Sequence, residues 1–272
     1  MRAPVHTLRL LVAYDGADFA GWQRQAGLRT VQGELEAVLG RIEGAPVHVA
    51  GAGRTDSGVH AAAQAASVRL AAAITPERLV RACNATLPGD VRVLSAEAMP
   101  DRFHARIHAR GKTYRYFVWH GQAGSPALRR ASWHVPQRLH LAAMQEAAHL
   151  FVGEHDFSSF QAQGSAVRST VRKVWTSTVE VIASPPWVNA ADRGRLLCYE
   201  VSGAGFLRHQ VRAMAGTLVL VGKGRLTPAD VTRALSAGRR AAAGPTAPAH
   251  GLHLWRVHYH DEQADGDRTT AC

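Results

Sequence analysis

The order in which strand-like and helix-like segments follow one another most restricts the fold of this 272-residue chain. Alternating apolar residues predict strands, whereas apolar residues three and four apart predict helices. In the first half these patterns predict a strand over 8–14, a helix over 31–42, strands over 46–51 and 63–70, a helix from Pro76 and a strand over 91–99. The resulting order is strand, helix, strand, strand, helix, strand.

The second half repeats this order. It predicts a strand over 112–119, a helix over 139–152, strands over 171–183 and 196–201, a helix over 206–221, a short extra helix after Thr227 and a closing strand over 252–257. Two such units in tandem predict an α+β protein of two ferredoxin-like, RRM-like βαββαβ halves with antiparallel sheets. We place the halves at 1–105 and 106–260, followed by a disordered tail over 261–272.

Three threonines mark predicted helix starts. Thr30 precedes the first helical pattern, Thr75 precedes a proline that suits the first helical position, and Thr227 is followed three residues later by Asp230. A threonine side chain can accept a hydrogen bond from the first turn, and the spacing to Asp230 is that of a capping box. Gly44 is expected to end the first helix.

The charge of the chain indicates a polyanionic partner. Its formal net charge is +11, and only three of its 32 basic residues are lysines. Arginine binds phosphate through two parallel hydrogen bonds and stacks on bases, so nucleic acid is the favoured partner. The alternative is an Arg- and Ala-rich genome that enriches both residues throughout its proteins.

One segment concentrates basic residues at nearly every other position. They are Arg102, His104, Arg106, His108, Arg110, Lys112 and Arg115. Together with aromatic residues nearby, this pattern is typical of an RNA platform, in which rings stack on bases and arginines follow the phosphates. A solvated strand edge is the other interpretation.

Several classes of protein are not expected. The three cysteines are far apart and odd in number, which favours a reducing cytoplasm over a disulfide framework or a zinc site. No segment approaches the roughly 18 uninterrupted apolar residues of a membrane helix, and Arg9 and Asp15 interrupt the N-terminal apolar run of a signal peptide. No HExxH motif, Walker loop or strand-linked GxGxxG predicts a metal, ATP or NAD.

The stretch from Gly51 to Ala61 is the strongest candidate site. Its three glycines permit positive φ and close backbone approach, and it carries Arg54 and Asp56 two residues apart. In extended backbone such residues point to the same side, so the guanidinium can keep the carboxylate ionised. An oriented carboxylate can serve as nucleophile, base or electrostatic stabiliser. A surface turn with an incidental ion pair is the alternative.

A second pair of arginines, Arg208 and Arg212, is four residues apart in the predicted helix over 206–221. We expect the two side chains to share one helix face near its first turns. Because the helix dipole disfavours cations there, an acidic side chain or a phosphate is expected nearby.

Eight motifs, in order, carry a resemblance to a known family. They are Gly21-Trp-Gln-Arg-Gln25, the segment from Gly51 to His60, Asn84-Ala-Thr-Leu-Pro-Gly-Asp90, Phe103-His-Ala-Arg106, Tyr114-Arg-Tyr116, Asp156-Phe-Ser-Ser-Phe160, Val211-Arg212 and Thr246-Ala-Pro-Ala-His-Gly-Leu252. From about residue 7 to 259 the chain resembles the bacterial tRNA pseudouridine synthase A family. Ser57 stands where alanine is usual, His253 where tyrosine is common, and residues 161–167 fit poorly.

The resemblance implies conversion of uridine to pseudouridine at positions 38, 39 and 40 of the tRNA anticodon stem-loop, without a cofactor or a metal. It assigns Asp56 as the nucleophile, Tyr114 as the residue that stacks on the target base, and Arg212 as the partner of the aspartate. Arg54 would help to extrude the nucleotide, and Leu252 would wall the uracil pocket. Further candidates for substrate binding are Arg24 and Arg208.

The active site is then expected in a cleft between the halves, in a cytoplasmic homodimer. Two other functions remain open at this point: a non-catalytic RNA-binding protein, and a hydrolase with a carboxylate nucleophile. The first leaves a carboxylate in a basic loop unexplained, since aspartate repels phosphate. The second needs another carboxylate or a metal ion.

Overall fold

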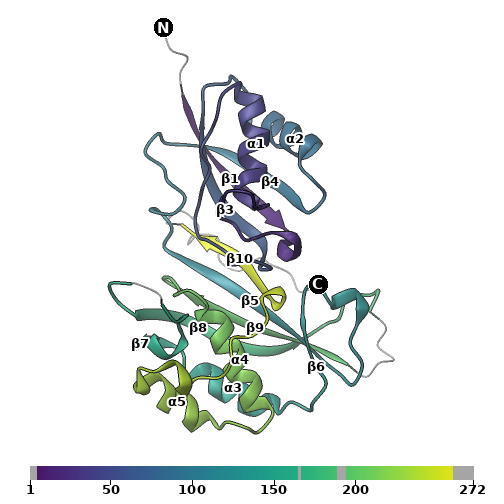
Figure 1. Ribbon diagram of the computed structural model, residues 1–272, viewed down its shortest axis with the longest axis vertical. Helices are drawn as coiled ribbons and strands as arrows, with labels where there is room; N and C mark the ends of the chain where they lie inside the picture. Colours follow the sequence, from purple (N-terminus) through teal and green to yellow (C-terminus); the bar gives the residue numbers. More distant parts are fainter. Residues whose placement is uncertain (1–4, 165–166, 189–193, 260–272) are drawn as a thin grey trace. The chain divides into compact units, whose positions relative to one another are not determined.

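A computed structural model describes residues 5–164, 167–188 and 194–259 (Figure 1). The chain divides into two compact units: Met1–Arg110 together with the segment that begins at His253, and Gly111–Leu252. The tail predicted over 261–272 lies outside the described residues. No helix in the described part of the chain is long and apolar enough to cross a membrane.

The first unit has the predicted order of elements. They are β1 (His6–Tyr14), α1 (Val31–Glu43), β2 (Ala50–Gly51), β3 (His60–Leu70), α2 (Pro76–Thr86) and β4 (Val91–Met99). Strand β1 lies between β4 and β3 and is antiparallel to both. Strand β2 pairs with β3 in antiparallel fashion, and β10 (Leu252–His258) pairs with it in parallel through His253 and Leu254.

The core of the first unit lies between its sheet and its two helices, which pack side by side on one face (Figure 1). Alternate residues of β1 are buried, as the alternation of apolar residues predicts: Leu8, Leu10, Val12 and Tyr14. The buried stripe of α1 supplies Val31, Leu35, Val38 and Leu39, and α2 supplies Leu79 and Cys83.

The second unit also combines one sheet with helices. Its elements are β5 (Gly111–His120), β6 (Trp133–Val135), α3 (Leu141–His149), β7 (Gly153–Asp156), β8 (Val171–Ile182), β9 (Arg195–Gly203), α4 (Gln210–Gly222) and α5 (Pro228–Ala237). The strand order β5-β9-β8-β7 is antiparallel throughout, and β6 adds to β5 in parallel. Helix α4 is buried over most of its surface, as expected of a helix whose own residues are mostly small or apolar on every side. The protein is therefore of the predicted α+β class.

The three helix starts predicted from threonines are confirmed. Thr30, Thr75 and Thr227 each accept a hydrogen bond from a backbone amide of the first turn. Thr227 and Asp230 form a complete capping box. Gly44 ends α1 in the left-handed conformation, with φ of 72°.

Element boundaries differ from the prediction where side chains replace regular hydrogen bonding. The strand predicted over 46–51 shrinks to β2, because α1 side chains satisfy the backbone of Val49. Its amide donates to Glu36 Oε1 over 3.1 Å, and its carbonyl accepts from Gln32 Nε2, also over 3.1 Å. The helix predicted over 139–152 covers only Leu141–His149. Strands β6 and β7 escaped prediction, since three or four residues are too few to show alternation.

Candidate active site

The loop that carries Asp56 connects β2 to β3 and is fastened to the segment after β1. The Trp22 amide donates to the Thr55 carbonyl over 3.1 Å, and the Ser57 hydroxyl donates to the Phe19 carbonyl over the same distance. The Gly58 amide also donates to Phe19, at 3.4 Å. Residues on both sides of Asp56 are thus held by backbone groups of one neighbouring segment.

A buried hydrogen bond joins the loop to strand β1. The Tyr14 hydroxyl and Thr55 Oγ1 lie 2.8 Å apart, and both residues are buried. Burial raises the pKa of Tyr14 far above its usual value, so this hydroxyl stays protonated. Gln64 Nε2 adds a bond of 2.8 Å to the Gly53 carbonyl. The residue immediately before Asp56 is therefore tied to the sheet.

Exposure alternates around Thr55. Arg54 is exposed, Thr55 is buried and Asp56 is half-buried, which is the alternation expected of extended backbone. Within the part of the chain that the structure describes, no ion pair joins Arg54 to Asp56. The exposed guanidinium is left available for a ligand outside the loop.

Two of the loop glycines do what the sequence predicted. Gly58 has φ of 77°, a conformation that side-chain-bearing residues rarely adopt. Gly51 lies against Trp22, and a Cβ there would come within 2.4 Å of the indole. Glycine at these positions lets the loop turn tightly and lets the fully buried Trp22 reach the backbone.

Arg24 is anchored through a buried carboxylate. Glu36 in α1 is only 8% exposed, and its Oε2 lies 3.2 Å from Arg24 Nη1. Gln32 accepts from the Arg24 amide over 2.9 Å and donates to Glu36 over 2.8 Å. The Arg24 side chain remains 70% exposed. The network holds both the backbone amide and the guanidinium of Arg24 and leaves most of the side chain open to solvent.

The far end of the loop is held by a buried histidine. The Gly16 amide donates to His60 Nδ1 over 3.0 Å, and Asp15 Oδ1 lies 3.1 Å from the same nitrogen. The His60 ring stacks on His253, with centroids 4.5 Å apart. This contact belongs to the parallel pairing of β3 with β10, whose first residue is Leu252.

In the second unit, Tyr114 lies on β5 and is 9% exposed. Its ring meets Phe206 edge-on, with centroids 5.4 Å apart. Tyr116 and Val118, two and four residues further along the same strand, are also buried and therefore lie on the same face as Tyr114. The Tyr116 hydroxyl donates to the Pro248 carbonyl over 2.9 Å.

Arg212 lies on α4 and forms hydrogen bonds with the segment that leads to Leu252. Its Nε donates to the Ala247 carbonyl over 2.8 Å, and the Ala247 amide donates back to the Arg212 carbonyl over 3.0 Å. Burial lowers the pKa of His250, and the positive charge of Arg212 acts in the same direction. Leu252 itself is 6% exposed. Arg212 is thus a fixed cation whose field reaches the residues before Leu252.

The predicted pairing of Arg208 and Arg212 on one helix face is wrong. Helix α4 begins at Gln210, because His209 adopts a left-handed φ of 64° and interrupts regular hydrogen bonding. The Gln210 side chain accepts from the Leu207 amide over 2.8 Å and closes the turn. Arg208 therefore lies before the helix and is exposed.

Several residues that shape these segments escaped the sequence analysis: Tyr14, Gln32, Glu36 and His60. Glu36 and Gln32 could have been noticed, because polar residues four apart lie beside the apolar stripe of α1. Among the described residues, no three His, Cys, Asp or Glu side chains gather closely enough to hold a metal ion. Asp56, Arg54 and Arg24 belong to the first unit, and Tyr114, Arg208, Arg212 and Leu252 to the second.

The sequence matches the family model described as tRNA pseudouridine synthase over residues 10–106 and 147–260. This chain belongs to that family. Similar proteins include the tRNA pseudouridine synthase A of Geobacillus kaustophilus, 42% identical over 94% of this chain and 95% of the relative. The enzyme of the same name from Solidesulfovibrio magneticus is 46% identical over 93% and 90%.

Membership of the tRNA pseudouridine synthase family makes the chain an isomerase that converts uridine to pseudouridine in tRNA. The match includes Asp56, Arg212 and Leu252, whereas Tyr114 falls between the two matched ranges. Among solved structures, a Cbf5-Nop10-Gar1 complex aligns with 90% of this chain and 57% of that chain, at 15% identity. The TM-score of this alignment is 0.33.

Proposed function

We propose that this enzyme isomerises uridines 38, 39 and 40 in the anticodon stem-loop of tRNA, with Asp56 as its nucleophile. The observation that carries the proposal is the immobilised carboxylate loop. Thr55 and Ser57, on either side of Asp56, are fixed by hydrogen bonds, while Asp56 stays partly open to solvent. A preorganised carboxylate loses little entropy when the substrate arrives.

The chemistry explains why such a loop is needed. Isomerisation breaks the bond between C1′ and N1, turns the uracil and joins C5 to C1′. A carboxylate can act at the sugar or at the base, and the detached uracil has to be kept from escaping. Exclusion of water would strengthen the electrostatic interactions of the carboxylate. The target base first has to leave its stack, at a cost of a few kcal/mol.

The other residues follow from the resemblance. Tyr114 stacks on the target base, Leu252 walls the uracil, and Arg212 pairs with the aspartate. Two hydrogen bonds support the role of Leu252, because Arg212 and Tyr116 hold the carbonyls of Ala247 and Pro248 in the segment that leads to it.

The exposed arginines of the proposal act on the RNA. Arg54 helps to extrude the nucleotide, and its exposure next to the Asp56 loop supports this role. Arg24 and Arg208 are further substrate-binding candidates. Gln32 accepts from the Arg24 backbone amide, Glu36 contacts Nη1 of its guanidinium, and the side chain is 70% exposed.

The test is tritium release from a tRNA transcript that carries 5-³H-uridine. Asp56→Asn keeps the size of the side chain and removes its charge, so release is expected to fall by about a thousandfold or more. Glu146→Gln likewise replaces a carboxylate by an amide, at an exposed position of α3, and should release tritium like wild type. Near wild-type release by Asp56→Asn would show that the nucleophile is assigned wrongly. Sequencing-based mapping of pseudouridine in the product would test positions 38 to 40.

The proposal includes a homodimer. Each of its subunits would consist of two ferredoxin-like halves, 1–105 and 106–260. The strand order β4-β1-β3, with β2 also on β3, supports such a fold for the first half. Sedimentation equilibrium at micromolar concentration tests the dimer: a single species of about 29.3 kDa would contradict it.

A further inference from the structure

A compact loop, Asp101–Arg110, follows β4 and is ordered by its own hydrogen bonds. The His108 amide donates to the His104 carbonyl over 3.1 Å, and the His104 amide donates to His108 Nδ1 over 3.0 Å. The Arg106 amide donates to His104 Nδ1 over 3.1 Å. The two histidine rings thus replace backbone partners that a helix or a sheet would supply.

Hydrogen bonds also hold the loop against the sheet of the first unit. Ala105 is fully buried, and its amide donates to Ser67 Oγ of β3 over 3.1 Å. The Tyr259 hydroxyl donates to the Ala105 carbonyl over 2.7 Å. At the end of the loop, the Arg110 amide donates to the His258 carbonyl over 2.8 Å.

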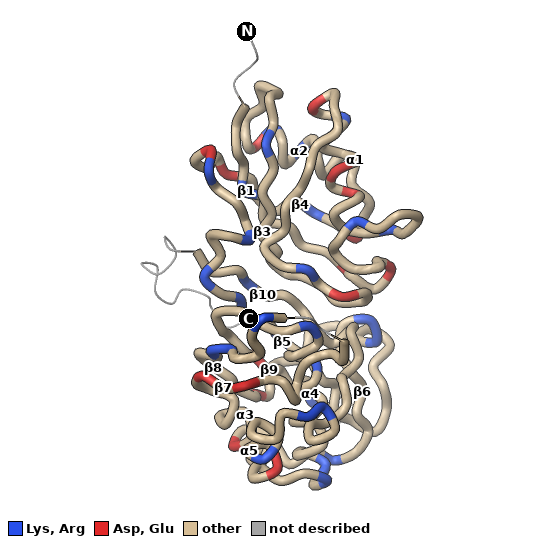
Figure 2. Tube along the Cα trace, turned by 60° about the vertical axis from the view of Figure 1, so that its left-hand side comes forward, with Lys and Arg blue, Asp and Glu red and all other residues tan. Residues whose placement is uncertain are grey.

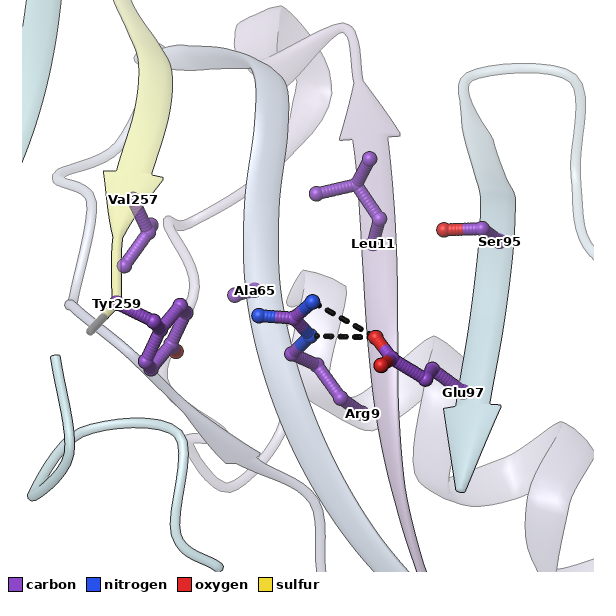
Figure 3. A pocket seen from close by; sticks show the side chains of 7 residues that line it. All are labelled: Arg9, Leu11, Ala65, Ser95, Glu97, Val257 and Tyr259. Atoms are coloured by element: carbon purple, nitrogen blue, oxygen red, sulfur yellow. Dashed lines mark hydrogen bonds and ion pairs between the residues drawn. The ribbon is translucent and has the colours of Figure 1, made fainter. Parts of the chain in front are cut away.

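Tyr259 is the main support of the loop, and it lines a small cavity of about 90 Å³ (Figure 3). The Arg9 guanidinium lies over its ring, 5.1 Å from the centroid, and is held by Glu97 at 2.7 Å. On the loop side, the Phe103 ring lies 5.5 Å from Tyr259 and stacks on His108 at 5.6 Å. A continuous series of packed rings therefore fixes the loop.

Three arginines of this rigid loop are exposed to solvent. Arg102, Arg106 and Arg110 are all exposed, and none forms an ion pair in the part of the chain that the structure describes. Other arginines of the chain do have carboxylate partners, for instance Arg29 with Asp90 and Arg9 with Glu97. Asp101 is the one carboxylate within the loop itself.

The remaining side chains of the loop add hydrogen-bond donors and apolar surface. Because His104 Nδ1 accepts from the Arg106 amide, its proton in the neutral form is on Nε2, where it can be donated to an acceptor. Ile107 is 74% exposed, the highest exposure of any large aliphatic side chain in the described residues. Donors, cations and one apolar side chain, held in a fixed frame, are the features that bind sugar and phosphate.

We propose that the Asp101–Arg110 loop is a preformed site for the RNA sugar–phosphate backbone, separate from the residues assigned to the reacting uridine. The inference rests on the proposed tRNA substrate. Arginine binds phosphate through paired hydrogen bonds, and a loop that is already ordered loses little entropy on binding. Basic positions occur over both units (Figure 2), but this loop combines exposed arginines with a rigid frame.

The test compares two triple variants with equal loss of charge. One is Arg102→Gln with Arg106→Gln and Arg110→Gln. The control carries Arg41→Gln, Arg78→Gln and Arg81→Gln, on exposed positions of α1 and α2. The probe is an unmodified tRNA transcript, and its Kd is measured between 50 and 200 mM salt.

The loop variant should lower the slope of log Kd against log salt by about 2 to 3, as expected for three lost phosphate contacts, and raise Kd at least about tenfold at low salt. The control should change the slope by less than about 1. At saturating tRNA, single-turnover tritium release by the loop variant should match wild type. Equal weakening in both variants, or wild-type binding by the loop variant, would overturn the proposal.

A charge-neutral variant tests the frame. Tyr259→Phe removes the hydroxyl that holds Ala105 and keeps every arginine, so it should weaken tRNA binding by a few-fold without changing the salt slope. No change in Kd would contradict the rigid support. Wild-type protein that releases no tritium from any tRNA would refute the proposed function, whereas active wild type with an unaffected loop variant refutes this inference alone.

Discussion

Replacing Gly216 by alanine tests how α4 positions the segment that leads to Leu252. Gly216 lies in the buried interior of α4, where alanine would normally stabilise a helix by about 1 kcal/mol. A Cβ at this position, however, would lie 1.8 Å from the Pro245 carbonyl oxygen and 3.3 Å from the Ala247 amide. These are backbone atoms and cannot turn aside as a flexible side chain does.

The two effects have opposite signs, and the clash should win. Overpacking costs about 1–3 kcal/mol, and displacing the segment also strains two hydrogen bonds between Arg212 and Ala247, each worth about 1 kcal/mol. After the helix gain is subtracted, the free energy of unfolding should fall by about 2–4 kcal/mol. In a protein of this size that lowers Tm by on the order of 10 °C.

Gly40→Ala provides the matched control. Gly40 also lies in a helix, α1, but its Cβ would be 3.3 Å from the carbonyl of Ala45, an exposed residue that can move. Its stability should change by less than about 1 kcal/mol. Urea denaturation and differential scanning calorimetry measure both variants. If Gly216→Ala proves as stable as Gly40→Ala, or releases tritium at the wild-type rate after losing stability, the reasoning about this segment fails.

Two further predictions concern buried groups. Tyr14→Phe should lower the free energy of unfolding by about 1–3 kcal/mol, because Thr55 Oγ1 loses a buried partner next to Asp56; adding Thr55→Val should cost less than the sum of the single changes in urea denaturation. Burial raises the pKa of Cys83 to about 11, so at pH 8 its thiol should be alkylated about a hundredfold more slowly in native than in unfolded protein. A variant whose other cysteines are serines measures this, and equal rates would contradict the burial.

The residue types of the Asp56 loop were sufficient to predict a candidate site from the sequence. Glycines, an arginine and an aspartate in one short stretch indicated the candidate site, and the structure adds the reason for its rigidity. Tyr14, Phe19 and Trp22 supply most of its contacts, yet they come from positions distant in the sequence. Local patterns carry no information on such partners, because any polar side chain within reach can make these bonds.

What the sequence determined by itself is the type and order of the larger elements. Hydrophobic periodicity and helix caps depend on residues within a few positions, so α1, α2 and α5 begin where Thr30, Thr75 and Thr227 predicted. The tertiary structure decided where long-range contacts replace local ones. Glu36 and Gln32 take the hydrogen bonds of Val49 from the sheet, and His209 delays the start of α4, which separates Arg208 from Arg212. Local propensity is weak, and one buried hydrogen bond of comparable energy is enough to override it.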